Sequence, residues 1–439
     1  MHGCISLEKY REIVNGVEVI KCTGQVVQVI GLTIEAEAPV GEVGEICHIY
    51  NTREAAYIPA EIVGFRKDRI LLMPYGELNG IGPGSKVVFT NKPFMVAVGS
   101  QLIGRILDGL GNPMDDKGPV ELEKWVSIQN VPPHPLNRQR ISTPLVLGVR
   151  AIDGLLTCGR GQRLGIFAGS GVGKSTLLGM IARNTLADVN VIALIGERGR
   201  EVREFIEKDL KKDGLERSVI VVATSDQPPL VRLKAAFVAT TIAEFFRDKG
   251  KNVLLMMDSL TRFAMAQREV GLAIGEPPVS RGYTPSVFSI LPKLLERVGN
   301  GEKGSITGLY TVLVDGDDFN EPISDAARGI LDGHIILSRR LANRNHYPAI
   351  DVLGSVSRVM PDIVDKSHMN VAAKIKTLMA AYEEARDLIN IGAYRRGSNP
   401  EVDEAIQKMP QITEFLQQAI DEKAEFEDTY RWMQRIVSS

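Results

Sequence analysis

The fold of this chain is decided by one stretch, Gly165-Ile166-Phe167-Ala168-Gly169-Ser170-Gly171-Val172-Gly173-Lys174-Ser175-Thr176. It begins as an apolar strand, continues as a glycine-rich turn and leads into an amphipathic helix over 177–182. Glycines allow successive backbone amides to converge on one point, and the N-terminus of a helix adds positive potential there. The stretch therefore predicts a phosphate-binding loop. The alternative is a glycine-rich turn that only allows tight packing, and the flanking strand and helix argue against it.

The loop predicts roles for its own side chains. The ammonium group of Lys174 is expected to reach the β- and γ-phosphates, and the hydroxyl of Ser175 is expected to bind Mg²⁺. Position 168 departs from the usual first glycine of the pattern, but a residue as small as alanine still fits. The predicted nucleotide-binding residues of the loop are Ala168, Gly169, Ser170, Gly171, Val172, Gly173, Lys174, Ser175 and Thr176.

The composition is that of an ordinary globular protein. With 439 residues the chain is long enough for about two to four domains. Its 52 Lys and Arg nearly balance its 54 Asp and Glu, so the net charge of −2 provides no overall attraction to nucleic acid. The four cysteines form no C-x-x-C pair, which is typical of reduced thiols in the cytosol. We find neither a signal segment nor an apolar run that could cross a bilayer, and therefore expect a cytoplasmic protein.

The sequence changes its pattern twice. Residues 1–91 contain six short β-rich runs separated by turns, which predicts a small closed barrel behind a short leading segment. Residues 92–365 form a connector followed by alternating strands and helices. Continuous apolar strands separated by helices imply a parallel sheet covered on both faces. Residues 366–439 are predicted to be helical. The sheet strands are expected at 163–168, 191–195, 219–222, 253–257, 307–314 and 333–338.

The barrel has two possible uses. A barrel that binds single-stranded nucleic acid would present exposed aromatic side chains between basic ones. Aromatic residues are sparse in this region and acids are at least as frequent as bases, so we expect an oligomerisation barrel and no nucleic-acid partner. In the leading segment, apolar residues within 5–14 could line one face of a short helix, but a loose terminus is favoured.

Two carboxylates follow apolar strands that are expected to lie near the loop. Asp258 closes the run 252–257 in the Walker-B form, whose carboxylate orders Mg²⁺ and its waters. A simple helix cap is the alternative for Asp258. Glu197 ends the run 189–196 and could orient or deprotonate the attacking water. It could equally be an acid that stabilises the start of a helix, and spacing alone does not choose between the two.

Further segments resemble a known family. Gly196-Glu197-Arg198-Gly199-Arg200-Glu201, Gly304-Ser305-Ile306-Thr307 and the segment 347–358 resemble the rotary ATP synthase superfamily. Within it, the segments 168–175, 258–262, 316–323 and 346–353 are similar to the type III secretion ATPases. The tail at 392–400 and 403–406 is most similar to the flagellar branch, in which alanine at position 168 is ordinary. The resemblance implies an α/β fold: a RecA-like P-loop ATPase core with a mostly parallel sheet, an N-terminal β-barrel and a C-terminal α-helical domain.

The resemblance also implies roles for residues outside the loop. Glu197 is implied as the catalytic carboxylate, and Arg198 and Arg297 match arginines near the phosphates in related subunits. Arg358 matches the arginine finger, which stabilises the transition-state charge on the nucleotide of a neighbouring subunit. Tyr347 matches a residue that stacks on adenine. From the residues alone, Arg358 could be a surface arginine and Tyr347 a packed core tyrosine.

The implied function is Mg²⁺-dependent ATP hydrolysis by a homohexamer that energises flagellar protein export. The implied partners are a coiled-coil stalk protein, a regulator protein, chaperone–cargo complexes and, through partners, the export gate in the membrane. The implied location is therefore the cytoplasmic face of the export apparatus. The loops 275–285 and 315–322 would face the stalk in the central hole, although both could also be solvated loops.

Other functions remain open at this stage. They are an RNA-driven motor of the Rho type, a virulence secretion ATPase and a ring subunit without catalytic activity. The presence of Lys174, Glu197 and Asp258 together argues against the last. The ATP synthase catalytic subunit itself is disfavoured, because the tail lacks a counterpart of its acidic lever segment.

Overall fold

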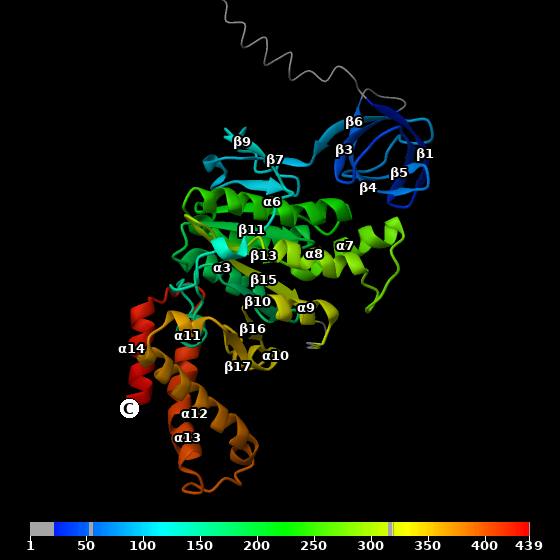
Figure 1. The fold of residues 1–439 in the computed structure, drawn as a ribbon. Coiled ribbons are helices and arrows are strands. Elements are labelled where there is room, and N and C mark those ends of the chain that lie inside the picture. The colour runs from blue at the N-terminus through cyan, green and yellow to red at the C-terminus, as the bar shows by residue number, and fades with distance from the viewer. Residues whose placement is uncertain (1–21, 52–55, 315–317, 319, 439) are drawn as a thin grey trace, which may run out of the picture. The chain divides into compact units, whose positions relative to one another are not determined.

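The computed structural model describes residues 22–51, 56–314, 318 and 320–438 (Figure 1). The expected leading segment at 5–14 and most of 315–319 lie outside these residues. The chain forms two compact units, Met1–Phe94 with Ala273–Gly275, and Met95–Leu272 with Glu276–Ser439. Among the described residues, no helix combines the length and apolar character needed to span a membrane. The division into 1–91, 92–365 and 366–439 stays a prediction.

The first unit contains a closed barrel of six antiparallel strands in the order β1-β2-β5-β4-β3-β6. Side chains alternate along these strands, and the inward set, including Val26, Ile34, Ile49 and Leu72, is fully or almost fully buried. This alternation is what the six short runs predict, and the barrel is confirmed. The strands are β1 (Thr23–Ile30), β2 (Thr33–Glu37), β3 (Glu45–Tyr50), β4 (Tyr57–Arg66), β5 (Arg69–Pro74) and β6 (Lys86–Pro93).

The second unit is built on a nine-stranded sheet with the main order β17-β16-β10-β15-β13-β11-β12-β8. The strands from β8 to β16 in this order run parallel, while β17 is antiparallel to β16 and β14 is antiparallel to β15. The strands are β8 (Ile106–Asp108), β10 (Arg163–Ala168), β11 (Val189–Ile195), β12 (Ser218–Ala223), β13 (Asn252–Asp258), β14 (Gly299–Asn300), β15 (Ser305–Leu313), β16 (Gly333–Leu337) and β17 (Ile350–Ser357). A separate antiparallel pair joins β7 (Met95–Val98) to β9 (Lys124–Ser127).

Helices cover both faces of this sheet, as predicted. The long helix α6 packs against β11, β12 and β13. On the other face, α3 shares an apolar core with Ile192 and Leu194 of β11. The helices of this region are α2 (Arg150–Leu155), α3 (Lys174–Asn184), α4 (Gly199–Glu204), α5 (Lys211–Leu215), α6 (Pro229–Asp248), α7 (Leu260–Ile274), α8 (Pro285–Leu295), α9 (Pro322–Ile330), α10 (Arg339–Ala342) and α11 (Met360–Ile363).

The sheet has a strand that the sequence analysis did not expect. β17 carries Asp351, Gly354, Ser355 and Ser357 among its apolar residues, so it lacks the continuous apolar run of a central parallel strand. An antiparallel strand at the edge of a sheet tolerates this mixture, because its outer side is not covered by another strand. Its direction matters for the site described below.

The C-terminal part consists of three helices, α12 (Lys366–Asn390), α13 (Pro400–Leu416) and α14 (Phe426–Ser438). Asp365 and Asn399 cap the first two by accepting backbone N–H groups, and Pro400 occupies a first-turn position that needs no donor. Figure 1 shows α12 and α13 as a hairpin, and the two helices are in contact along their length. The buried Phe415 of α13 and Met433 of α14 lie against Gly154 of α2 and anchor these two helices to the core.

Candidate active site

The phosphate-binding loop lies between β10, which ends at Ala168, and α3, which begins at Lys174. Gly171 and Gly173 have φ angles of +76° and +89°, a left-handed conformation that side chains with a Cβ rarely adopt. Val172 is 2% exposed and holds the middle of the loop in the core. Ser170 and Gly171 are exposed. The loop therefore presents backbone to solvent at the N-terminus of a helix, as an anion site requires.

The carboxylates of Asp258 and Glu197 both form ion pairs with Lys174 of the phosphate-binding loop. The Nζ atom of Lys174 lies 2.5 Å from Oδ1 of Asp258 and 3.3 Å from Oε1 of Glu197. The three residues come from the C-terminal ends of β10, β13 and β11, which reach the same edge of the parallel sheet. Ligands of open α/β sheets bind at this edge. The structure thus brings Lys174, Glu197 and Asp258 together beside the loop that contains Ser175 and Thr176.

The charges in this cluster shift the pKa values of its members. Burial and the nearby charge of Asp258 raise the pKa of Glu197 to about 7, although Lys174 opposes the shift. Burial disfavours the charge of Lys174, but the two facing carboxylates outweigh it and raise the pKa of the amine. A hydrogen bond with Glu197 lowers the pKa of Glu201, one helical turn further on. Lys174 is therefore charged, while Glu197 can gain or lose a proton near neutral pH.

One member of this cluster, Thr311, was not predicted from the sequence. The hydroxyl Oγ1 of Thr311, on β15, lies 2.7 Å from Oδ1 of Asp258 and donates a hydrogen bond to it. Thr311 is fully buried, as are its neighbours in the strand, Tyr310 and Val312. The available signal was weak, a single hydroxyl in an apolar strand next to the strand that ends in Asp258.

A second turn borders the loop. Tyr347 precedes Pro348 through a cis peptide bond, and a Cβ added to Gly173 would lie 3.4 Å from its ring. Tyr347 is 41% exposed, so it is not the packed core tyrosine of the alternative interpretation. Arg339 donates from Nη1 to the carbonyl of Ser170 at 3.2 Å, a contact that no sequence motif indicated. The structure therefore places the side chain of Tyr347 beside Gly173 of the loop.

The predicted arginines occupy three different environments. Arg198 follows Glu197, but its side chain is 78% exposed and pairs with Glu201 at 3.1 Å. Arg358 follows β17 and donates to the carbonyls of Leu331 and Arg328. Because β17 runs antiparallel to β16, its residue Ile350 is level with the loop while Ser357 is level with Gly333. Arg358 therefore lies at the edge of the sheet away from its own loop, about 13 Å along β16.

Arg297 does not belong to this site, and its expected place near the phosphates is corrected here. It is 1% exposed, and its guanidinium donates to Glu244 at 2.6 and 2.9 Å and to the hydroxyl of Thr241. Arg297 precedes β14, whose Gly299 pairs with Ile306 at the start of β15. The phosphate-binding loop lies at the other end of β15, where Leu313 pairs with Ala168. These ends are about 23 Å apart, at seven strand rises. Arg297 instead stabilises the packing of α6.

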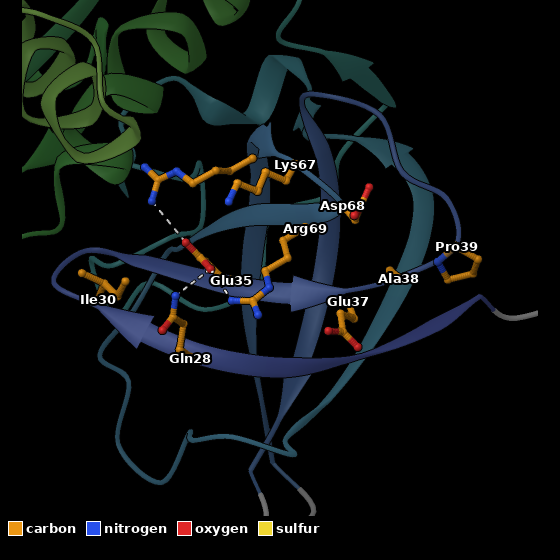
Figure 2. A pocket seen from close by; sticks show the side chains of 10 residues that line it. Gln28, Ile30, Glu35, Glu37, Ala38, Pro39, Lys67, Asp68 and Arg69 are labelled. Carbon is orange, nitrogen blue, oxygen red and sulfur yellow. Dashed lines mark hydrogen bonds and ion pairs between the residues drawn. The ribbon is translucent and has the colours of Figure 1, made fainter.

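A pocket of about 960 Å³ in the barrel offers a different chemistry (Figure 2). Its central carboxylate, Glu35, accepts hydrogen bonds from Arg69 at 2.9 Å, Gln28 at 2.7 Å and Arg66 at 3.2 Å. The hydrogen bonds from Arg69 and Gln28 lower its pKa. The pocket is lined by as many acids as bases, and two of the bases, Arg66 and Arg69, are paired with Glu35. Its lining therefore carries no excess of positive charge to attract a phosphate group.

Comparison with known proteins identifies the chain. The Flagellum-specific ATP synthase of Bacillus subtilis (strain 168) is 59% identical over 407 residues, 92% of this chain and 93% of that protein. The chain belongs to the flagellar and type III secretion ATPases of the ATP synthase alpha/beta family. The nucleotide-binding domain of that family matches residues 148–357, its beta-barrel domain matches 26–91, and the T3SS EscN ATPase C-terminal domain matches 364–435.

Solved structures agree with this assignment. The assembled ATPase EscN from the type III secretion system of enteropathogenic E. coli aligns with a TM-score of 0.90 at 50% identity, covering 94% of this chain and all of that one. EscN in complex with its central stalk EscO aligns with a TM-score of 0.88 at 49% identity, with the same coverage. The predicted family and fold class are confirmed, and this member of the family is an ATPase.

Proposed function

We propose that this chain hydrolyses ATP with Mg²⁺ at the subunit interfaces of a homohexamer and so energises flagellar type III protein export. The observation that carries the catalytic part is the convergence of Lys174, Glu197 and Asp258 beside the glycine loop, with Lys174 within 3.3 Å of both carboxylates. Family membership supports the export part.

The residues of the site suit metal-assisted phosphoryl transfer. The hydroxyl of Ser175 and the carboxylate of Asp258 are oxygen ligands of the kind Mg²⁺ prefers, and Mg²⁺ commonly takes one or two such ligands together with phosphate oxygens. These two residues would hold the ion, which would neutralise charge on the phosphates. The loop amides from Gly169 to Thr176 would bind the phosphates, and Tyr347 would stack on the base.

Hydrolysis needs a water that attacks the γ-phosphorus while the bond to the β-phosphate oxygen breaks, giving ADP and phosphate. Glu197, with a pKa of about 7, is suited to orient this water and accept its proton. Phosphate oxygens would compete with Glu197 and Asp258 for Lys174. Nucleotide binding would thus withdraw the lysine from Glu197 and leave that carboxylate available to the water.

The ring is proposed because β17 leads Arg358 to the edge of the sheet opposite the loop of its own subunit, away from a nucleotide bound to that loop. A neighbouring subunit would supply this arginine to the developing charge. EscN has been solved in an assembled form, which supports such a contact. Arg198, largely exposed beside Glu197, could serve the same interface.

Mixing two inactive variants tests the shared site. Lys174→Ala destroys the loop and Arg358→Ala removes the finger, so each variant alone should be inactive. In a 1:1 mixture, about a quarter of the interfaces would combine an intact loop with an intact finger, since each interface is heterologous. ATPase activity should therefore reappear on mixing and rise with protein concentration. Continued inactivity of the mixture, or full activity of Arg358→Ala alone, would contradict the shared site.

A ring of subunits would leave a central hole in which a partner protein could bind. EscO is the central stalk of EscN, and a similar coiled-coil stalk is proposed to enter this ring between the loops 275–285 and 315–322. Arg281 and Asp318 link these loops by an ion pair of 3.0 Å. A regulator protein, chaperone–cargo complexes and the membrane export gate are the further proposed partners, reached from the cytoplasmic face of the membrane.

Arg281→Glu should weaken stimulation of the ATPase by the stalk while leaving the basal rate unchanged.

A further inference from the structure

We propose that Thr311 is a positioning residue that keeps Asp258 oriented for the metal when Lys174 turns to the phosphates. The proposal rests on the function given above and adds a residue that no motif includes. Both donors, Lys174 at 2.5 Å and Thr311 at 2.7 Å, contact the same oxygen, Oδ1 of Asp258. Phosphates compete for the lysine, whereas the threonine is fixed in the sheet and stays with the carboxylate.

The position of Thr311 follows from the strand order. β15 lies between β10, which leads into the loop, and β13, which ends in Asp258. Thr311 is paired with Ile166 of β10, and its neighbour Tyr310 is paired with Met257 of β13. The residue is therefore held level with Asp258 by backbone hydrogen bonds on both sides. No rotation of a helix or loop is needed to place its hydroxyl.

The hydrogen bond is directed at the carboxylate. A threonine hydroxyl has one proton to donate. Its other acceptor within reach, the carbonyl of Met257, is 3.4 Å away, at the limit of a hydrogen bond. The proton is therefore committed to Asp258 at 2.7 Å, and bonds to an ionised acceptor are stronger than neutral ones. Thr311 is fully buried, so water cannot replace this donor without repacking of the strand.

The same strand contains a matched control. Thr307 is 1% exposed, and its hydroxyl accepts a hydrogen bond of 2.9 Å from the backbone N–H of Gly161 near the start of the strand. Thr307 thus performs a purely structural task at the edge away from the loop. A valine at either position removes one buried hydroxyl from β15, but only Thr311→Val removes a donor from Asp258.

The test measures the affinity for a fluorescent ADP analogue with Mg²⁺ and with EDTA. In Thr311→Val, the affinity in EDTA should equal that of the unchanged protein. The tightening caused by Mg²⁺ should shrink roughly tenfold, as expected for one lost hydrogen bond to a charged group. Thr311→Ser restores the donor and should restore the Mg²⁺ effect. Thr307→Val should lower the melting temperature and leave the Mg²⁺ effect intact.

Several outcomes would overturn the proposal. One is an unchanged Mg²⁺ effect in Thr311→Val, and another is an equal loss in Thr307→Val. If Thr311→Val does not fold, Thr311→Ala offers the same comparison with less side-chain volume, and an undiminished Mg²⁺ effect in it counts against the proposal. Lys174→Ala, run in parallel, separates the two proposals: if it binds the analogue normally, the proposed function itself is wrong.

Discussion

At the scale of single residues, Lys174 is the centre of the site because three groups depend on its charge. It faces Asp258 and Glu197 in this structure, and the proposed mechanism transfers it to the phosphates. Each carboxylate therefore has two effects. In the proposed mechanism it serves the reaction directly, and it also competes with the phosphates for the lysine.

Glu197→Gln separates these two effects. The amide keeps the shape of the side chain but carries no charge, so it competes less for Lys174 and cannot accept a proton from water. We expect the variant to bind ATP at least as tightly as the unchanged protein and to hydrolyse it at least about a hundredfold more slowly. Nucleotide titration and single-turnover measurements would check both expectations. Glu204→Gln, which changes a half-buried glutamate on α4, is the control and should alter neither.

The pH dependence of the reaction offers a second check. Burial and Asp258 raise the pKa of Glu197 to about 7, well above its ordinary value. Below this pH the carboxyl group is protonated and cannot accept a proton. The value of kcat/KM should therefore rise as the pH increases through about 7 and level off above it. The remaining activity of Glu197→Gln should lack this rise. An unchanged rise in that variant would assign the titration to another group.

At the scale of helices and strands, the buried ion pair between Arg297 and Glu244 holds α6 to the segment after α8. Arg297→Ala would leave the carboxylate of Glu244, which is 4% exposed, without its cationic partner. Loss of one partner of such a pair costs about 3–5 kcal/mol of folding free energy. We expect this loss in urea unfolding, with the KM for ATP unchanged in the folded protein. A raised KM at normal stability would instead support the original placement near the phosphates.

The strands also explain how far the sequence alone could go. The glycine loop, Glu197 and Asp258 follow continuous apolar runs, and in a parallel sheet such runs end at one edge, so their convergence could be predicted. Arg297 was misplaced because a resemblance in sequence does not show at which edge a residue lies. Thr311 was missed because its partner belongs to a neighbouring strand. The strand β17 was missed because its polar residues hide the apolar pattern.

At the scale of the whole second unit, the segment between α13 and α14 connects the C-terminal helices with the nucleotide turn. The backbone N–H of Gln418 donates to the carbonyl of Tyr347 at 3.0 Å, and its side chain accepts from the N–H of Arg150 at 2.9 Å. Arg150 is buried, donates to the carbonyl of Phe415 at 2.9 Å and lies 4.8 Å from the ring of Trp432. Movement of this segment would therefore displace Tyr347.

Arg150→Ala should loosen this connection. It leaves the carbonyl of Phe415 without its donor, which costs about 2 kcal/mol. Hydrogen exchange of the amides in α13 and α14 should accelerate, and the affinity for ATP should fall through Tyr347. Arg431→Ala removes an exposed ion pair from α14 and should change neither quantity. Equal exchange rates in the two variants would show that Arg150 does not anchor the C-terminal helices.

The antiparallel direction of β17 affects how many catalytic centres each added subunit would complete in the proposed ring. Because the strand takes Arg358 away from the loop of its own subunit, each complete catalytic centre of the proposed ring would require one neighbour on a particular side. An open row of subunits always has one terminal loop without an arginine and one terminal arginine without a loop. Closing the row brings that loop and that arginine together, so the last subunit to arrive completes two centres, whereas the first completes none and each of the others completes one.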